Sequence, residues 1–201
     1  IPMCPIGYSW FPFFLKKYII NNSKKQGIGQ QIDEKIIGSR ERREHFMEKV
    51  SLKGVIDMHV HTNPDLRHRA YDDFELTDAA IRVGARAIVI KTHQGVTMDR
   101  AYLCNEYNKR VNKGNNNFTM FGSITLNKQV GGINPYAVEP ALKLGAKVVW
   151  LPTMSAVNHI QKMKGDMSRA VEVVRDGKIV PELNDVFQLI KDHDAVLGTA
   201  H

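Results

Sequence analysis

Two stretches of the sequence decide the fold: Ala80–Thr92, AIRVGARAIVIKT, and Ala141–Thr153, ALKLGAKVVWLPT. They align without a gap, and each reads as a helix end, a glycine, an alanine, a basic residue and an apolar strand that closes on threonine. A glycine directly after a helix is typical of a helix C-terminus, because it adopts a positive φ at little cost. The offset of 61 residues corresponds to two βα units of about 30 residues each, and such repeats favour a (β/α) barrel.

Strands and helices are expected to alternate from residue 54 onward, which predicts a parallel sheet with right-handed crossovers. The expected strands cover residues 54–61, 85–90, 118–126, 147–151 and 195–199, and the expected helices cover 73–83, 97–111, 135–144 and 183–192. A complete barrel has eight units and about 250 residues. The predicted fold class is therefore α/β, a partial (β/α)8 TIM-type barrel of about five βα units of eight, incomplete at its C-terminus.

An open, doubly wound sheet is the alternative fold. No GxGxxG follows the first expected strand, and no GxxxxGK[ST] occurs in the sequence. The nucleotide-binding versions of that fold therefore lack support.

Three regions are expected along the chain. Residues 1–30 form an irregular N-terminal extension, because Pro2, Pro5 and Pro12 interrupt its apolar residues. A membrane-spanning helix needs about 20 apolar residues in a row, so no membrane association is expected. Residues 31–53 form a charged helical lead-in, and residues 54–201 form the incomplete barrel.

Charge and cysteine content restrict the class of partner. The net charge is +7, and residues 1–53 hold ten Lys/Arg against five Asp/Glu. Most of the basic excess therefore lies outside the barrel, which argues against nucleic-acid binding. The two cysteines, Cys4 and Cys104, form neither a disulfide framework nor a CxxC zinc motif, and this indicates a cytoplasmic protein.

The first expected strand carries the strongest chemical signal, Asp57-Met58-His59-Val60-His61. Side chains alternate along a strand, so Asp57, His59 and His61 share a face. In a barrel that face can point inward, with His61 at the carboxyl end where active sites lie. Two imidazoles so placed can bind one zinc-like ion, and Asp57 could orient one of them by accepting a hydrogen bond. The alternative is a pair of core histidines.

Polar residues also follow the other expected strands. Lys91 and His93 are the predicted catalytic residues: Lys91 holds a substrate anion or acts as a base, and His93 is an acid/base group, a ligand or a plain rim residue. His201, at the mouth of the fifth strand, is the predicted third metal ligand. The predicted substrate-binding residues are Asn63, Asn127 and Thr153.

The run GVIDMHVHTNPD resembles the first-strand signature of the amidohydrolase superfamily, a group of metal-dependent hydrolases with an HxH pair on strand one. The ordered stretches IVIKTHQGVTMDRA, GGINPYAVEPALKLGAKVVWLPT and HDAVLGTAH are similar to an uncharacterised amidohydrolase-like branch, and the resemblance covers roughly residues 50–201. It implies metal ligands at His59, His61 and His201, and a further His and Asp on strands six and eight that this sequence does not contain.

The sequence departs from the family pattern at strand four. Many members carry a carboxylated, metal-bridging lysine at the end of that strand, where this sequence has Trp150-Leu151-Pro152-Thr153. A site with one divalent ion, zinc by preference, is therefore expected over a site with two.

The resulting functional prediction is a hydrolase of the amidohydrolase type, in which a metal-activated water attacks an amide-like C–N bond or an ester of a small molecule. The alternatives are a metal- or small-molecule-binding barrel without turnover and an HxH-type phosphoesterase. The 201-residue chain alone is expected to be inactive and to bind metal weakly. Unpaired strand edges make a homo-oligomer possible.

One further segment, residues 154–181, precedes the last expected helix. Within it, Asp176-Gly177 predicts a hairpin with a type I′ turn. The hairpin is either a lid over the active face or decorative.

Overall fold

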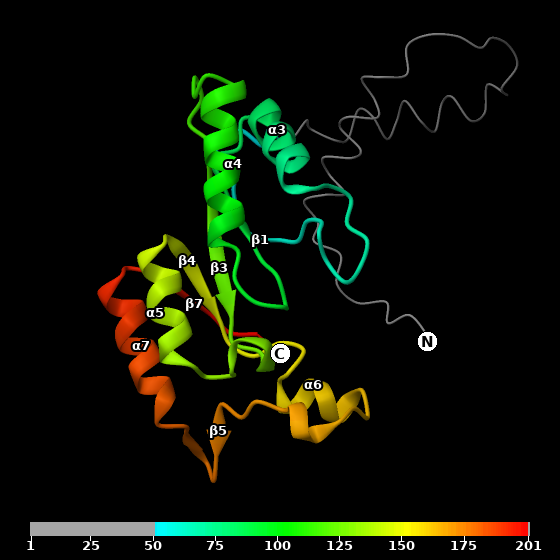
Figure 1. The fold of residues 1–201 in the computed structure, drawn as a ribbon, viewed down its shortest axis with the longest axis vertical. Helices are drawn as coiled ribbons and strands as arrows, with labels where there is room; N and C mark the ends of the chain where they lie inside the picture. The colour runs from blue at the N-terminus through cyan, green and yellow to red at the C-terminus, as the bar shows by residue number, and fades with distance from the viewer. Residues whose placement is uncertain (1–50, 201) are drawn as a thin grey trace, which may run out of the picture.

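The structure, a computed structural model, describes residues 51–200. The predictions for residues 1–50 and for His201 therefore lie outside the described residues. Five parallel strands form one sheet in the order β1-β2-β3-β4-β7, which curls into a half-barrel (Figure 1). The strands are β1 (Ile56–Val60), β2 (Ala87–Ile90), β3 (Thr119–Thr125), β4 (Ala146–Trp150) and β7 (Val196–Gly198). The predicted α/β class and parallel sheet are confirmed.

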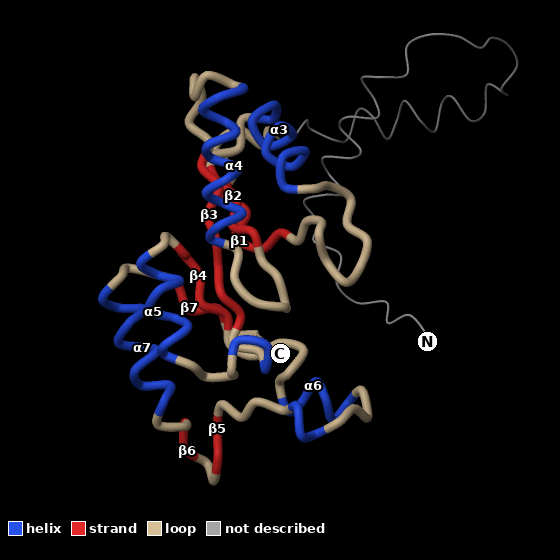
Figure 2. The backbone as a smooth tube through the Cα atoms, viewed as in Figure 1, coloured by secondary structure: helices blue, strands red, loops and turns tan. Residues whose placement is uncertain are grey.

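Four helices cover the outer face of the sheet (Figure 2). They are α3 (Asp73–Val83), α4 (Met98–Val111), α5 (Pro135–Lys143) and α7 (Glu182–Asp192). Helices α3 and α4 bury one apolar cluster against the first three strands, which includes Leu76, Ile88 and Met120. Helices α5 and α7 bury a second cluster against β3, β4 and β7. Alternation along each strand leaves the other side chains on the inner, concave face.

Helix α3 begins and ends where its sequence predicts. Its N-cap is Asp72, whose Oδ1 accepts a hydrogen bond from the Glu75 backbone N–H at 2.8 Å. The Glu75 carboxylate in turn accepts from the Asp72 backbone N–H at 2.9 Å, which completes a capping box. Gly84 ends the helix with φ 75°. These caps fix the connection that delivers the chain from β1 to β2.

Helix α4 lies so close to β3 that the strand needs a glycine at residue 122. A Cβ atom built on Gly122 would lie 2.5 Å from the Cα of Met98. Any larger residue would push the helix away from the sheet. This approach also places Thr97, the residue before α4, where its hydroxyl donates to the carbonyl of Ile90 at 2.7 Å.

The segment between β4 and α7 contains more structure than its sequence predicts. It forms α6 (Val157–Lys162), the 3-10 turn η2 (Met167–Arg169) and a hairpin of β5 (Val174–Arg175) and β6 (Lys178–Ile179). Asp176 and Gly177 have φ of 51° and 73°, as the predicted type I′ turn requires. A second 3-10 turn, η1 (Lys128–Val130), follows β3. Across residues 51–200, no helix has the length and apolar character needed to cross a membrane.

Candidate functional site

The centre of the site is the histidine pair at the carboxyl end of β1. The Nε2 atoms of His59 and His61 lie 3.2 Å apart. Two nitrogens bound at about 2.0–2.1 Å to one tetrahedral ion would lie about 3.3–3.4 Å apart. His59 and His61 therefore point the same way, as strand alternation predicts. The separation of their Nε2 atoms suits two ligands of one ion.

The carboxylate of Asp65 lies close to an imidazole nitrogen of His61. The Nδ1 atom of His61 is buried without a hydrogen bond among the described residues, and the Asp65 Oδ2 lies 3.6 Å from it. A shift of a few tenths of an ångström would make a hydrogen bond. Asp65 is therefore placed to orient His61 from its outer side.

Asp57 follows the strand parity, and its Oδ1 accepts a hydrogen bond from the backbone N–H of His59 at 3.0 Å. Its predicted role in orienting an imidazole stays a prediction. Asp65, from the loop after β1, is a second carboxylate that can orient one.

A charged clamp holds the loop after β1. The Arg100 guanidinium on α4 donates to both carboxylate oxygens of Asp73, at 2.7 and 2.8 Å, and to the hydroxyl of Thr62 at 2.8 Å. Thr62 also donates to Asp73 at 2.5 Å. Because Thr62 is buried and directly follows His61, this clamp fixes the end of β1 against α3 and α4.

Asn63 organises the same loop and does not face the site as a free binding group. Its amide donates to the carbonyl of Arg69 at 3.0 Å and accepts from the Arg69 backbone N–H at 3.1 Å. Arg69 also forms an ion pair with Asp65 at 2.6 Å. In the structure Asn63 closes the 63–69 loop, and its predicted contact with a substrate stays a prediction.

Lys91 follows β2 and is 3% exposed. Its Nζ lies 4.2 Å from the ring centroid of Trp150, over the face of the indole. The Trp150 ring in turn lies 5.0 Å from the His59 ring, centroid to centroid. The cluster of His59, His61, Lys91 and Trp150 thus joins residues from three strand ends on the concave side.

Asn127, predicted to bind substrate, holds three strand ends together and is completely buried. Its Oδ1 accepts from the backbone N–H groups of Thr153 at 2.8 Å and Ser155 at 3.0 Å. Its Nδ2 donates to the carbonyl of His93 at 2.9 Å and to the Thr153 hydroxyl at 2.8 Å. All four bonds are made within the protein, so Asn127 acts by positioning its neighbours.

The same bonds fix the proton on His93. The two backbone donors identify the amide oxygen of Asn127, so its nitrogen must be the atom that donates to Thr153. The Thr153 hydroxyl is 0% exposed and lies 2.8 Å from Nδ1 of His93. A hydroxyl that accepts from the Asn127 amide has its own proton to donate, which favours the His93 tautomer with the proton on Nε2. Thr153, also predicted to bind substrate, instead orients this ring.

Burial sets the protonation of the site. The pKa of His61 is lowered to about 2, first by burial and then by the charges of Arg69, His93, His59 and Lys91. Burial lowers the pKa of Lys91 to about 8. Burial also raises the pKa of Asp57 above its ordinary value. At neutral pH, His61 is the neutral imidazole that a metal ion needs, while Lys91 is mostly protonated.

The donor set fits a metal ion only in part. His59 and His61 have suitable spacing, and the buried Nδ1 of His61 beside Asp65 suits a ligand that binds through Nε2. Within residues 51–200, however, no group of three or more His, Cys, Asp or Glu side chains is arranged to hold an ion. His93 stacks on His61 at 4.8 Å between ring centroids, and its Nδ1 lies 2.8 Å from the Thr153 hydroxyl. The predicted third ligand, His201, lies outside the described residues.

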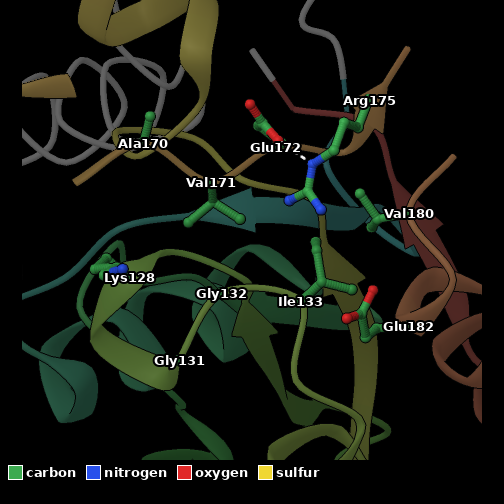
Figure 3. A pocket seen from close by; sticks show the side chains of 10 residues that line it. All are labelled: Lys128, Gly131, Gly132, Ile133, Ala170, Val171, Glu172, Arg175, Val180 and Glu182. Atoms are coloured by element: carbon green, nitrogen blue, oxygen red, sulfur yellow. Dashed lines mark hydrogen bonds and ion pairs between the residues drawn. The ribbon is translucent and has the colours of Figure 1, made fainter. Parts of the chain in front are cut away.

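A separate pocket lies between the loop after η1 and the segment that carries the hairpin (Figure 3). Gly131 and Gly132 line one side, and Val171, Arg175 and Val180 line the other. Arg175 is held there by an ion pair with Glu172 at 2.7 Å. None of the histidines or Lys91 lines this pocket, so the hairpin closes a second hollow and its predicted role as a lid over the active face stays a prediction.

The fold and the site define an α/β half-barrel protein with a histidine–lysine cluster at the carboxyl edge of its parallel sheet. The chain belongs to a family of unknown function, DUF6282, whose model matches residues 54–201. No curated protein and no solved structure matches the chain.

Three contributors to the site were missed from the sequence: Asp65, Arg100 and Trp150. The spacing of Asp65 four residues after His61 is a weak signal, because the loop path decides whether the two meet. Arg100 reads as an ordinary helical surface residue. Trp150 reads as a strand residue, and only the curl of the sheet brings its ring to Lys91 and His59.

Proposed function

We propose that this protein is a metal-dependent hydrolase of the amidohydrolase type, acting on an amide-like C–N bond or an ester of a small molecule. The observation that carries the proposal is the 3.2 Å separation of the His59 and His61 Nε2 atoms at the carboxyl edge of a parallel sheet. In barrels of this architecture that edge is where active sites are built. The proposal includes the finer description of the fold as five βα units of an eight-unit barrel, supported by the internal repeat.

His59 and His61 would hold one zinc-like ion, together with His201. Such an ion supplies Lewis-acid chemistry, which lowers the pKa of water and polarises the scissile carbonyl. The residues of the chain supply the rest. Asp65 orients His61, the clamp of Arg100 fixes the loop that carries both, and His93 presents an N–H from Nε2 that can donate a proton or a hydrogen bond to the leaving group.

The cellular setting belongs to the same proposal. A cytoplasmic location is part of the proposal, and the cysteine content of the chain, with two cysteines and no CxxC motif, agrees with it. The proposal also includes a small-molecule substrate, no nucleic-acid partner and a possible homo-oligomer.

Zinc content tests the proposal. We expect the wild-type chain, after exposure to zinc and dialysis, to retain more metal than a His59→Ala, His61→Ala double variant. A matched control removes two other histidines, His68→Ala and His159→Ala, and should leave the zinc content unchanged. Equal zinc in all three proteins, measured by mass spectrometry of the metal, would refute the assignment.

A binding protein without turnover is the second candidate, and one observation favours it. The described residues supply two ligands and no third, which is a weak set for catalysis. Zinc-loaded protein that binds small molecules but hydrolyses no amide or ester from a broad panel would support this candidate over the first.

A further inference from the structure

Lys91 carries a positive charge that nothing in the described chain neutralises. It is 3% exposed, and among residues 51–200 no carboxylate lies within 4.0 Å of its Nζ. Its Nζ lies over the face of Trp150, 4.2 Å from the ring centroid. A cation on a buried side chain without an anion is costly in free energy, and an anion that reached it would offset this cost.

The neighbours of Lys91 do not supply that anion. His59, His61 and His93 add further nitrogen groups to the same cluster. The two nearby carboxylates are engaged elsewhere, Asp65 by the Arg69 guanidinium and Asp57 by a backbone N–H. Neither carboxylate forms an ion pair with Lys91.

Trp150 supplies a second donor beside the lysine. Its indole Nε1–H is buried and makes no hydrogen bond to any described residue. The ring is held by close packing on Gly198, where a Cβ atom would lie 2.1 Å from Cε3. The ammonium group over the ring and the indole N–H both lack an acceptor among the described residues, and both are donors that an oxyanion can satisfy.

We propose that Lys91, on the Trp150 ring, binds an oxyanion group of a small molecule, a carboxylate or a phosphate. That this molecule is the substrate rests on the proposed hydrolase function, whereas the anion site itself does not. The protonated state of Lys91 at neutral pH agrees with the proposal, because its pKa of about 8 leaves the amine mostly charged.

The test titrates the full chain at pH 7 with inorganic phosphate and with malonate, using neutral acetamide as the control probe, followed by calorimetry. We expect one or both anions to bind and acetamide not to bind. Phosphate alone would identify a phosphate-bearing ligand, and malonate alone a carboxylate-bearing ligand. Absence of binding by both anions would overturn the proposal.

Variants locate the site. Lys91→Met should weaken anion binding about 10-fold or more, the loss expected for a charge-assisted hydrogen bond. Lys91→Arg keeps the charge, and Lys191→Met removes an exposed charge on α7; both should stay within about threefold of wild type. Unchanged affinity in Lys91→Met would also overturn the proposal. If that variant does not fold, the indole N–H resonance of Trp150 in the wild type decides, because phosphate or malonate must shift it.

The titrations are repeated on chelator-treated and zinc-loaded protein, which separates this proposal from the hydrolase proposal. Anion binding at Lys91 without zinc binding at His59 and His61 refutes the hydrolase and leaves the oxyanion site standing. Zinc binding at His59 and His61 without any anion binding refutes the oxyanion site and leaves the hydrolase proposal standing.

Discussion

Replacing Asn127 with alanine should destabilise the protein more than any exposed asparagine can. The amide is completely buried and makes four hydrogen bonds, to His93, to Ser155 and twice to Thr153. Each bond contributes about 0.5–1.5 kcal/mol, and unpaired buried partners add to the loss. Because the four share one side chain, they do not add fully, and we expect a loss of about 3–4 kcal/mol in the free energy of unfolding.

Urea denaturation followed by circular dichroism measures this loss. The control is Asn184→Ala on the exposed face of α7, which should change the free energy of unfolding by less than about 0.5 kcal/mol. Asn127→Asp keeps the shape but turns the donating nitrogen into an oxygen that faces two acceptors, so it should cost at least as much as alanine. A loss below about 1 kcal/mol in Asn127→Ala would refute the view that this amide ties the three strand ends together.

Two further predictions concern the imidazoles. In metal-free protein the His61 ring should stay neutral from pH 7 to pH 4.5, because its pKa is lowered to about 2. Below pH 6.5 the unfolded chain binds a proton at residue 61 that the folded protein does not bind. The free energy of unfolding therefore falls as the pH drops through about 6.5, by up to about 1.4 kcal/mol per pH unit. In His61→Gln the free energy of unfolding from urea denaturation should depend less steeply on pH, and an equal pH dependence in both proteins would contradict this. Thr153→Val removes the hydroxyl that donates to His93, so nitrogen NMR should show the proton of His93 spreading from Nε2 to Nδ1, whereas an unaltered ring spectrum would mean that Thr153 does not set the tautomer.

The elements were predictable where the sequence marks its own boundaries. Asp72 and Gly84 delimit α3, and Pro135 begins α5, so both helices fall where local chemistry puts them. Helix α6 was not predicted, because Val157–Lys162 is six residues long and its N-cap, Ala156, makes no side-chain cap bond. Short helices of this kind depend on tertiary packing and leave little periodic signal.

The residues of the site likewise divide into those that a local rule predicts and those that depend on tertiary contacts. Strand parity alone predicts that His59 and His61 point together, since alternation is a local rule. The roles of Asn127 and Thr153 follow from contacts across 26 residues of sequence, and no local rule distinguishes an amide that binds a substrate from one that binds its own backbone. The structure brings the described polar residues of the strand ends to one edge of the sheet, whereas their separate contacts could be assigned only from the structure.

Asn127 and Thr153 affect the chemistry at the carboxyl edge of the sheet through His93. The buried amide of Asn127 fixes Thr153, Thr153 fixes the proton of His93, and His93 stacks on His61 at 4.8 Å. A single chain of contacts thus connects the ends of β3 and β4 to the ring that faces the histidine pair of β1. With its proton on Nε2, His93 is a hydrogen-bond donor within the cluster, and His59 and His61 are the nitrogens proposed to bind a metal ion. The oxyanion proposed for Lys91 would bring an acceptor to this group of donors.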